Sequence, residues 1–375
     1  MTIDVYERLA KHVDNLPAGY PRSESGVEMR ILRRIFSPEE AELALHLTLI
    51  PEEPRVIAHR AQKPIEEVVQ RLEQMDKKGQ VISYQAGGET LQYQAAQYIA
   101  GFWEGQVNNL DRQLAEDFEE YLPTYLDYDV LQKAPQLRTI PVGESIDPET
   151  EVMSYENAYE FVRKQESIAV ANCICRQERK LIGEGCDKLE ETCMAFGDAA
   201  DHGVRTGRTR AITTEEALTI IRQSEEVGLV LQPANSKDPL ALCMCCGCCC
   251  MVFRRMKLHP HPASVVSTPF MAALDPDNCT GCGTCETRCQ MDAIYVDNGT
   301  ATLDLKRCIG CGLCVSTCPS ESISIVRKPE SEQPFVPKDE AETYIKLGQA
   351  RGKLGIAELI GMQAKSTWDR LIAPK

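Results

Sequence analysis

Hydrophobic positions recur at helical spacing in several stretches of the chain. The segment SPEEAELALHLTLI begins with Ser37 as the N-cap and Glu40 completing a capping box, so a helix is predicted from the intervening proline. Another helix is predicted between Thr213 and Gly228. Residues 293–305 instead read as strand, turn and strand. An α+β fold is therefore expected.

The N-terminal third has a distinctive order of predicted elements. Residues 52–96 read as a helix, a turn at Lys63-Pro64, a second helix and a hairpin that turns at Gly87-Gly88. Helix, turn, helix and β-wing is the layout of winged-helix domains, and residues from about 25 to 100 resemble one. The following segment, QVNNLDRQLAEDFEEYLP, continues as an acidic amphipathic helix. We therefore predict a winged-helix-like, mostly helical domain with its following helix over residues 1–130.

The charge of this region and of the whole chain indicates which class of partner it binds. The second helix, PIEEVVQRLEQMDKK, is more acidic than basic, whereas a helix that reads a DNA groove needs a basic footprint. The whole chain has a net charge of −15 and a pI near 5.0. Nucleic acid and anionic membrane surfaces are therefore excluded as main partners, and docking to protein is expected. The alternative for this region is a redox-sensing winged-helix regulator.

All eighteen cysteines lie between Cys173 and Cys318. Because disulfides are disfavoured in a reducing cytosol, metal or redox use is the leading interpretation. No secretory pattern and no apolar run of roughly 18 residues is present, so we expect a cytoplasmic protein without a transmembrane segment. We predict a cysteine-rich domain at 131–270, a second cysteine-containing domain at 271–328, and a proline-rich linker with a helical tail at 329–375.

Two copies of one cysteine motif lie in the second of these domains. CTGCGTCETRC begins at Cys279 and CIGCGLCVSTCP begins at Cys308, and each reads C-x2-C-x2-C-x3-C. Three thiolates at this spacing on a glycine-containing loop can reach three corners of one 4Fe–4S cluster, while the fourth points at the other cluster. One predicted cluster is held by Cys279, Cys282, Cys285 and Cys318, and the other by Cys308, Cys311, Cys314 and Cys289.

Over residues 275–327 the sequence resembles a bacterial two-cluster ferredoxin. The resemblance implies a ferredoxin-like fold, two 4Fe–4S clusters and one-electron transfer. Gln290 follows Cys289 where Pro319 follows Cys318, which changes the local turn but not the ligation. Zinc is disfavoured because zinc sites prefer two C-x2-C pairs over three cysteines in a row plus a fourth.

Ten further cysteines lie upstream of these motifs. They are Cys173, Cys175, Cys186 and Cys193 and, within the segment CMCCGCCC, Cys243, Cys245, Cys246, Cys248, Cys249 and Cys250. With four ligands per cubane, eight of the ten suffice for two more clusters, or up to four in the chain. In the simplest partition the first four hold one cluster and four of the last six hold the other. Alternatively, each cluster draws on both segments, or one cluster, a zinc site or a store of reduced thiols is present.

Adjacent cysteines point in different directions, so Cys245 and Cys246 are not expected to ligate one cluster together. Cys245-Cys246-Gly247 also resembles the CCG motif of heterodisulfide-reductase-type subunits, which hold noncubane clusters and carry out disulfide chemistry. The resemblance covers three residues, and a second copy of the motif is missing. It implies the alternative of an oxidoreductase with a catalytic cluster or a thiol–disulfide site within residues 243–250.

No other motif points to chemistry on a substrate. The chain has no G-x-G-x-x-G after a predicted strand, no phosphate loop and no recognisable nucleophile–base pair. Because each cluster accepts or donates one electron, several in series form a conduit. The sequence therefore predicts an anaerobic-type electron-transfer protein with several 4Fe–4S clusters. It is expected to be a non-catalytic subunit or partner of a larger cytoplasmic oxidoreductase complex.

Overall fold

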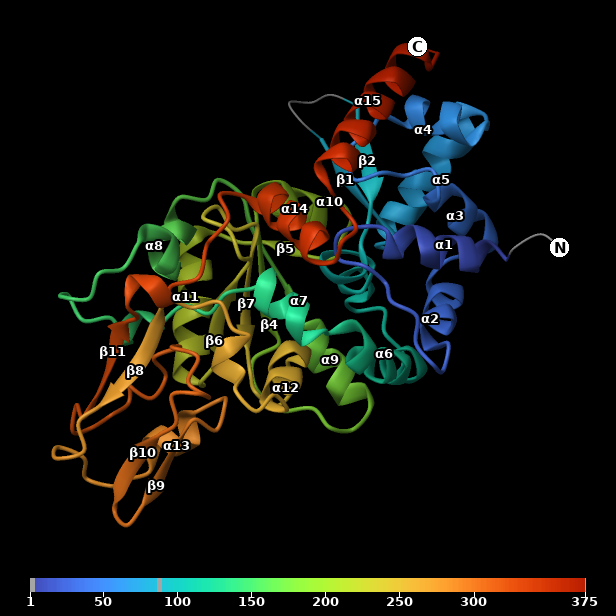
Figure 1. Ribbon diagram of the computed structural model, residues 1–375. Coiled ribbons are helices and arrows are strands. Elements are labelled where there is room, and N and C mark those ends of the chain that lie inside the picture. Colours follow the sequence, from blue (N-terminus) through green and yellow to red (C-terminus); the bar gives the residue numbers. More distant parts are fainter. Residues whose placement is uncertain (1–3, 86–89, 375) are drawn as a thin grey trace. The chain divides into compact units, whose positions relative to one another are not determined.

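The computed structural model describes residues 4–85 and 90–374 (Figure 1). The chain divides into two compact units. The first takes in residues 1–125, 202–208 and 344–375, and the second takes in residues 126–201 and 209–343. The hairpin turn predicted at Gly87-Gly88 lies outside the described residues.

The first unit is mostly helical. Its elements are α1 (Val5–Asp14), α2 (Val27–Ile35), α3 (Pro38–Ala44), α4 (Pro54–Ala61), α5 (Ile65–Lys77), β1 (Val81–Tyr84), β2 (Gln92–Ala95), α6 (Arg112–Tyr125) and α15 (Ile356–Ile372). Ser37 caps α3 in the predicted capping box with Glu40. Strands β1 and β2 pair antiparallel, so the order of helix, helix and hairpin agrees with the sequence pattern.

Aromatic rings fill the centre of this unit. Tyr98 contacts Tyr20, Phe102, Tyr121 and Tyr125 with ring centroids 4.7–5.4 Å apart. Edge-to-face and tilted packing of this kind stabilises a core beyond the burial of apolar area. Tyr121 and Tyr125 belong to α6, Tyr98 and Phe102 to the short helical segment Tyr98–Phe102, and Tyr20 to the segment between α1 and α2. The rings therefore join several helices of the unit.

A buried ion pair fixes α15 against α4. Glu52, which is fully buried, lies 2.8 Å from Arg60 and accepts a hydrogen bond from the Ser366 hydroxyl at 2.8 Å. Arg60 also pairs with Asp369 at 2.8 Å. The tail helix contains an interior Gly361, which weakens an isolated helix by about 0.8–1.0 kcal/mol relative to alanine. Its contacts with α4 supply the surface that such a helix needs.

A five-stranded antiparallel sheet with the order β5-β3-β4-β7-β6 organises the second unit. Its strands are β3 (Ile168–Asn172), β4 (Glu191–Phe196), β5 (Arg210–Ala211), β6 (Val230–Pro233) and β7 (Ala241–Cys245). The helices are α7 (Tyr128–Lys133), α8 (Ala158–Arg163), α9 (Ile174–Leu181), α11 (Thr214–Glu226) and α12 (Met251–Lys257), with α10 (Gly197–Arg205) leading from β4 into residues 202–208. Thr213 caps α11 and Gly228 follows it with a φ of +76°, as predicted.

Alternation along β4 and β7 sorts their side chains between the two faces of the sheet. Met194 and Leu242 are buried in the core that also contains residues of α8 and α11. Cys193 lies opposite Cys243 in the strand register, one residue away from each of those core side chains, so both cysteines face the other side. Figure 1 shows α9 and α12 on that other side of the sheet. Both of these helices have a cysteine as the N-cap.

The last part of the second unit is built from two antiparallel strand pairs. Strand β8 (Phe270–Leu274) pairs with β11 (Ile323–Arg327), and β9 (Ile294–Asp297) pairs with β10 (Thr300–Leu303). Helix α13 (Thr284–Arg288) lies between β8 and β9 in the chain, and α14 (Glu340–Ala350) leads towards the tail. The predicted strand, turn and strand over residues 293–305 are confirmed as β9 and β10.

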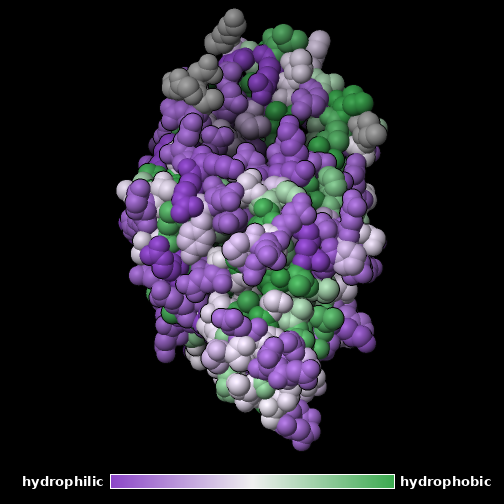
Figure 2. Space-filling view, turned by 90° about the vertical axis from the view of Figure 1, so that its left-hand side faces the viewer, coloured by the Kyte–Doolittle hydropathy of each residue, from purple (hydrophilic) through white to green (hydrophobic). Residues whose placement is uncertain are grey.

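The face of the molecule drawn in Figure 2 is largely polar. Hydrophilic residues predominate on the face drawn in Figure 2, interrupted by small hydrophobic patches. Within residues 4–85 and 90–374, no helix has the length and apolar character needed to cross a membrane.

Candidate metal centres

Four cysteines of the repeated motifs line one cavity near the C-terminal strands. They are Cys279, Cys282, Cys285 and Cys318. The Cys279 sulfur accepts hydrogen bonds from the amides of Gly281 and Ala301 at 3.4 and 3.3 Å, and the Cys318 sulfur lies 3.3 Å from the Ser322 hydroxyl. Such hydrogen bonds to sulfur tune the reduction potential of an iron–sulfur cluster. The structure thus brings together the set that was assigned to one cluster.

The other four motif cysteines, Cys289, Cys308, Cys311 and Cys314, also lie together. The Cys289 sulfur accepts a hydrogen bond from the Ala293 amide at 3.2 Å, and the Cys308 sulfur accepts one from the Ala272 amide at 3.4 Å. Burial, with the nearby charges of Cys289 and Cys308, raises the pKa of Cys311 to about 12. Burial and the nearby charges of Cys311, Cys308 and Cys289 raise the pKa of Cys314 well above its ordinary value. Thiolates crowded in this way need a bound cation to be stable.

A glycine at the same position of each motif makes these loops tight. Gly281 has a φ of +67°, and a Cβ atom there would lie 2.2 Å from the carbonyl oxygen of Gly299. Gly310 has a φ of +64°, and its Cβ would lie 2.3 Å from the carbonyl oxygen of Phe270. Only glycine combines this backbone conformation with such close approach, so both loops depend on it.

The family comparison agrees with this geometry. Residues 272–325 match the family described as a 4Fe-4S dicluster domain. This part of the chain is a dicluster domain. The domain implies two 4Fe–4S clusters, and the eight motif cysteines fit them in number, grouping and backbone environment. No match to the chain was found among curated proteins or among solved structures.

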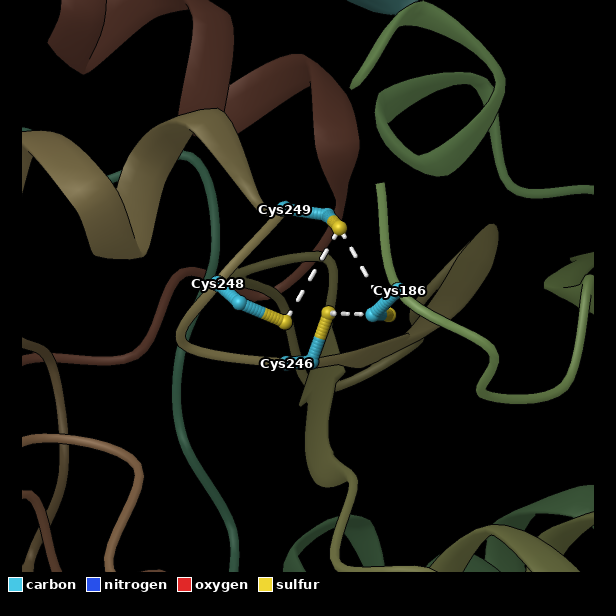
Figure 3. A group of neighbouring side chains, drawn as sticks. All are labelled: Cys186, Cys246, Cys248 and Cys249. Carbon is cyan, nitrogen blue, oxygen red and sulfur yellow. Dashed lines mark hydrogen bonds between the residues drawn. The ribbon is translucent and has the colours of Figure 1, made fainter. Parts of the chain in front are cut away.

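Four cysteines of the central region converge on one point (Figure 3), and we call them the four-thiol group. Cys186 comes from the loop between α9 and β4, whereas Cys246, Cys248 and Cys249 come from the loop after β7. All four sulfur atoms lie within 4.8 Å of one another. The Cys186 sulfur is 3.9 Å from that of Cys246 and 3.5 Å from that of Cys249. Such a group could hold a metal.

The spacing of these sulfur atoms has a chemical meaning. Four sulfurs bound at about 2.3 Å to one tetrahedral ion are separated by about 3.8 Å. Thiolates bind a 4Fe–4S cluster at its outer corners and therefore stand further apart. The four-thiol group matches a single ion as it stands, and it must open outwards to take a cubane. A hydrogen bond from Cys249 and the charge of Arg176 lower the pKa of Cys246 to about 4, so one ligand is readily available as a thiolate.

The other six central cysteines form a second set, which we call the six-thiol group. Side-chain hydrogen bonds connect them in the order Cys173, Cys175, Cys250, Cys245, Cys243, Cys193. Hydrogen bonds from Cys193 and Cys245 hold the pKa of Cys243 well below its ordinary value. Those from Cys175 and Cys245 do the same for Cys250. Hydrogen bonds join only neighbours along this series, whereas all four sulfurs of the four-thiol group lie within 4.8 Å of one another.

This grouping differs from the simplest partition of the sequence, in which Cys186 shares a site with Cys173, Cys175 and Cys193. Because β4 and β7 are adjacent, Cys193 lies beside Cys243 and joins the last segment. Each group therefore draws on both segments, which was the alternative partition. Cys245 and Cys246 lie in different groups, as their adjacency suggested. Cys248 and Cys249 share one group because the chain turns sharply between them.

Arg176 lies between the two groups. Its side chain is fully buried and donates hydrogen bonds to the Thr192 hydroxyl and to the Met244 carbonyl oxygen. Burial alone lowers the pKa of an arginine, but negative charge on Cys173, Cys246, Cys245 and Cys186 raises that of Arg176 above its ordinary value. Two of these cysteines belong to each group. The sequence carried a signal for this residue, since Arg176 directly follows Cys175 in CICR, but its role was not foreseen.

The dicluster domain and the four-thiol group meet at one hydrogen bond. The amide of Gly247, in the middle of the CMCCGCCC segment, donates to Oε1 of Gln290 at 2.7 Å. Gln290 directly follows Cys289, and Gly247 stands between Cys246 and Cys248. A Cβ atom at Gly247 would lie 2.3 Å from the Gln290 carbonyl oxygen, so glycine is required for this approach. Glutamine at position 290 thus supplies a hydrogen-bond acceptor that proline would lack.

Proposed function

We propose that the protein carries single electrons between the dicluster domain and a metal–thiolate centre in the four-thiol group. The observation that supports this most strongly is the hydrogen bond between Gly247 and Gln290. It joins the neighbour of a cluster cysteine, Cys289, to the peptide between two cysteines of the four-thiol group. Cys289 and Cys311 also pack against the hydrophobic core that contains Cys246. The route therefore runs through packed protein rather than through water.

Iron is the metal that suits this function. Fe–S clusters and iron–thiolate centres exchange one electron, whereas zinc has no redox chemistry. When bound, the clusters supply the one-electron steps. The protein contributes amide and hydroxyl hydrogen bonds to the sulfurs, and low solvent exposure around Cys308 and Cys285. Both features set the potential of a cluster.

The experiment compares two glycine-to-alanine variants of the intact, anaerobically prepared protein. Gly247→Ala forces the CMCCGCCC segment away from Gln290, whereas Gly361→Ala lies in open space on α15 and serves as the control. Limiting reductant is mixed in, and rapid freeze-quench EPR follows the signals of the dicluster domain and of the central centre. Gly247→Ala should slow the appearance of the central signal, and Gly361→Ala should not.

A second variant guards against simple misfolding. Gln290→Pro restores the residue that follows the last cysteine of the other motif and removes the acceptor for Gly247. It should also slow the transfer while both dicluster signals remain. Zinc in the four-thiol group of anaerobic protein, or equal transfer rates in wild type and both variants, would overturn the proposal.

We also propose that the electrons leave to or arrive from other redox proteins, as in a subunit or partner of a larger cytoplasmic oxidoreductase complex. The eighteen free cysteines favour a reducing compartment. The order of α4, α5, β1 and β2 supports a winged-helix-like docking module, and acidic Glu66 and Glu67 at the start of α5 favour protein over DNA as its partner. Binding of the protein to duplex DNA at physiological salt would contradict this assignment.

A further inference from the structure

We infer that the six-thiol group is a separate iron–sulfur centre, and that Arg176 is a positioning residue shared by this centre and the four-thiol group. The inference rests on the proposed function, because it extends the same electron route by one more centre. It assigns a metal site to Cys173, Cys175, Cys193, Cys243, Cys245 and Cys250, and it gives a role to a buried arginine.

The first argument is the arrangement of the six sulfurs. They come from the end of β3, from β4, from β7 and from the N-terminal ends of α9 and α12, so the fold itself gathers them. Each sulfur touches the next along the series. Cys193 lies opposite Cys243 in the strand register, and Cys173 and Cys250 are the N-caps of α9 and α12. The six sulfurs thus form one connected set that draws on both cysteine segments.

This spread distinguishes the two groups. The four sulfurs around Cys186 lie within 4.8 Å of one another, but in the described part of the chain no three of the six sulfurs do so. A single ion needs converging ligands, whereas a multi-iron cluster is held at its periphery. Four of six thiolates satisfy a 4Fe–4S cluster, and the remaining two are within reach as further ligands. Like the four-thiol group, these sulfurs must move apart to hold a cluster, and their number is enough for one of about four irons.

The second argument is the charge of Arg176. A guanidinium with no solvent exposure is costly unless anions surround it. Its hydrogen bonds go to the Thr192 hydroxyl and the Met244 carbonyl oxygen, which are neutral groups that directly adjoin cysteines of the six-thiol group. Its Nε is buried without a hydrogen-bond partner in the structure. A permanent cation in this position requires a lasting negative charge close by, which metal–thiolate centres supply.

Arg176 should therefore set the potentials of both centres. A nearby positive charge favours the reduced, more negative state of a cluster, so removal of that charge should shift both central potentials to more negative values. The potentials of the dicluster domain should not follow. A purely structural arginine would instead change metal content or folding.

The test uses the full-length protein prepared without oxygen. Cys193→Ser combined with Cys243→Ser removes two neighbouring sulfurs on β4 and β7, and Cys248→Ser removes one ligand of the four-thiol group. The double variant should lose about four irons and about four acid-labile sulfides, while the EPR signals of the dicluster domain persist as a check on folding. Cys248→Ser should leave the irons and sulfides of the six-thiol group in place.

Iron and sulfide contents equal to wild type in the double variant would overturn the assignment of the six-thiol group. The proposed function would then stand, because the dicluster domain and the four-thiol group are scored by their own signals. Redox titration of Arg176→Met against Arg176→Lys tests the shared role. Lower potentials for both central centres in the methionine variant alone support it, and unchanged potentials in both variants contradict it.

Discussion

The dicluster domain and the central sheet domain bring the cysteines of their sites together in different ways. In the dicluster domain, three of the four sulfurs of each set come from one short loop, such as Cys279 to Cys285. In the central domain, Cys186 and Cys246 meet across 60 residues of sequence, and strand register decides which thiols become neighbours. The comparison shows that local spacing identifies a site only where a single loop builds it.

This difference affects how strongly the metal centres of each domain should depend on one another. Backbone amides and hydroxyls surround the sulfurs of the dicluster domain, so each set has its own neutral hydrogen-bond donors. The two central groups are proposed to share one buried cation, Arg176. We therefore expect the central centres to respond to each other's loss, and the dicluster clusters to respond much less.

The largest effect is expected when one exposed cysteine is replaced by serine in each of the two domains. Cys282 and Cys248 are both exposed members of their sets. Cys282→Ser should remove about four irons and leave the central potentials unchanged, because only its own cluster loses a ligand. Cys248→Ser should empty the four-thiol group and also shift the potential of the six-thiol group through Arg176. Iron and sulfide analysis measures the cluster content, and potentiometric EPR measures the potentials. Identical responses of the central centres to the two variants would contradict the expected difference between the domains.

A smaller effect is expected in the first unit, in which none of the cysteines lies. Glu52→Gln removes one partner of the buried pair with Arg60, which should lower the free energy of unfolding by about 3 kcal/mol. Hydrogen exchange of amides in α4 and α15 reports this loss locally. Iron and sulfide contents should equal those of wild type. Glu42→Gln, at the exposed pair with Arg8, is the control and should cost no more than about 1 kcal/mol.

The charge of Arg176 should change the reduction potentials of the central centres by a comparable free energy. At an effective dielectric constant of about 20, a unit charge about 6 Å away contributes roughly 3 kcal/mol. For a one-electron couple this corresponds to a shift of roughly 130 mV towards more negative potential in Arg176→Met. Arg176→Lys, which keeps the charge, should retain most of the wild-type potential in a spectroelectrochemical titration. Shifts of equal size in the dicluster domain would count against a local effect.

The smallest effect concerns a single hydroxyl in the dicluster domain. Ser322 lies 3.3 Å from the Cys318 sulfur, and Ser320 lies further away at 3.7 Å. Loss of one hydrogen bond is worth about 1 kcal/mol, or roughly 40 mV for one electron, so Ser322→Ala should lower the potential of this cluster by that amount. Ser320→Ala should lower it less. Equal shifts, or a change in the other cluster, would show that the hydroxyl acts indirectly.

The sequence predicted the dicluster domain in detail because its chemistry is local. The motif spacing around Cys279 and Cys308 agrees with the match over residues 272–325 and with the cavity that the first set lines. The helix starts at Ser37 and Thr213 also needed only local information, since a cap depends on the next three residues. These features do not depend on how distant segments meet.

The central groups could not be derived in the same way. The position of Cys193 next to Cys243 follows from the pairing of β4 with β7, which is a contact across distant sequence. The burial of Arg176 and the role of Gln290 depend on the same tertiary packing. A single sequence shows that these residues are near cysteines in the chain, but not which sulfurs they face.

The most direct test of the account is a count of iron and acid-labile sulfide per chain in protein isolated without oxygen, with zinc measured in the same sample. The account predicts at least about 12 irons, of which about 8 survive in a variant that lacks Cys193, Cys243 and Cys248. A wild-type content of no more than about 8 irons, with zinc or free thiols in the central domain, would contradict it.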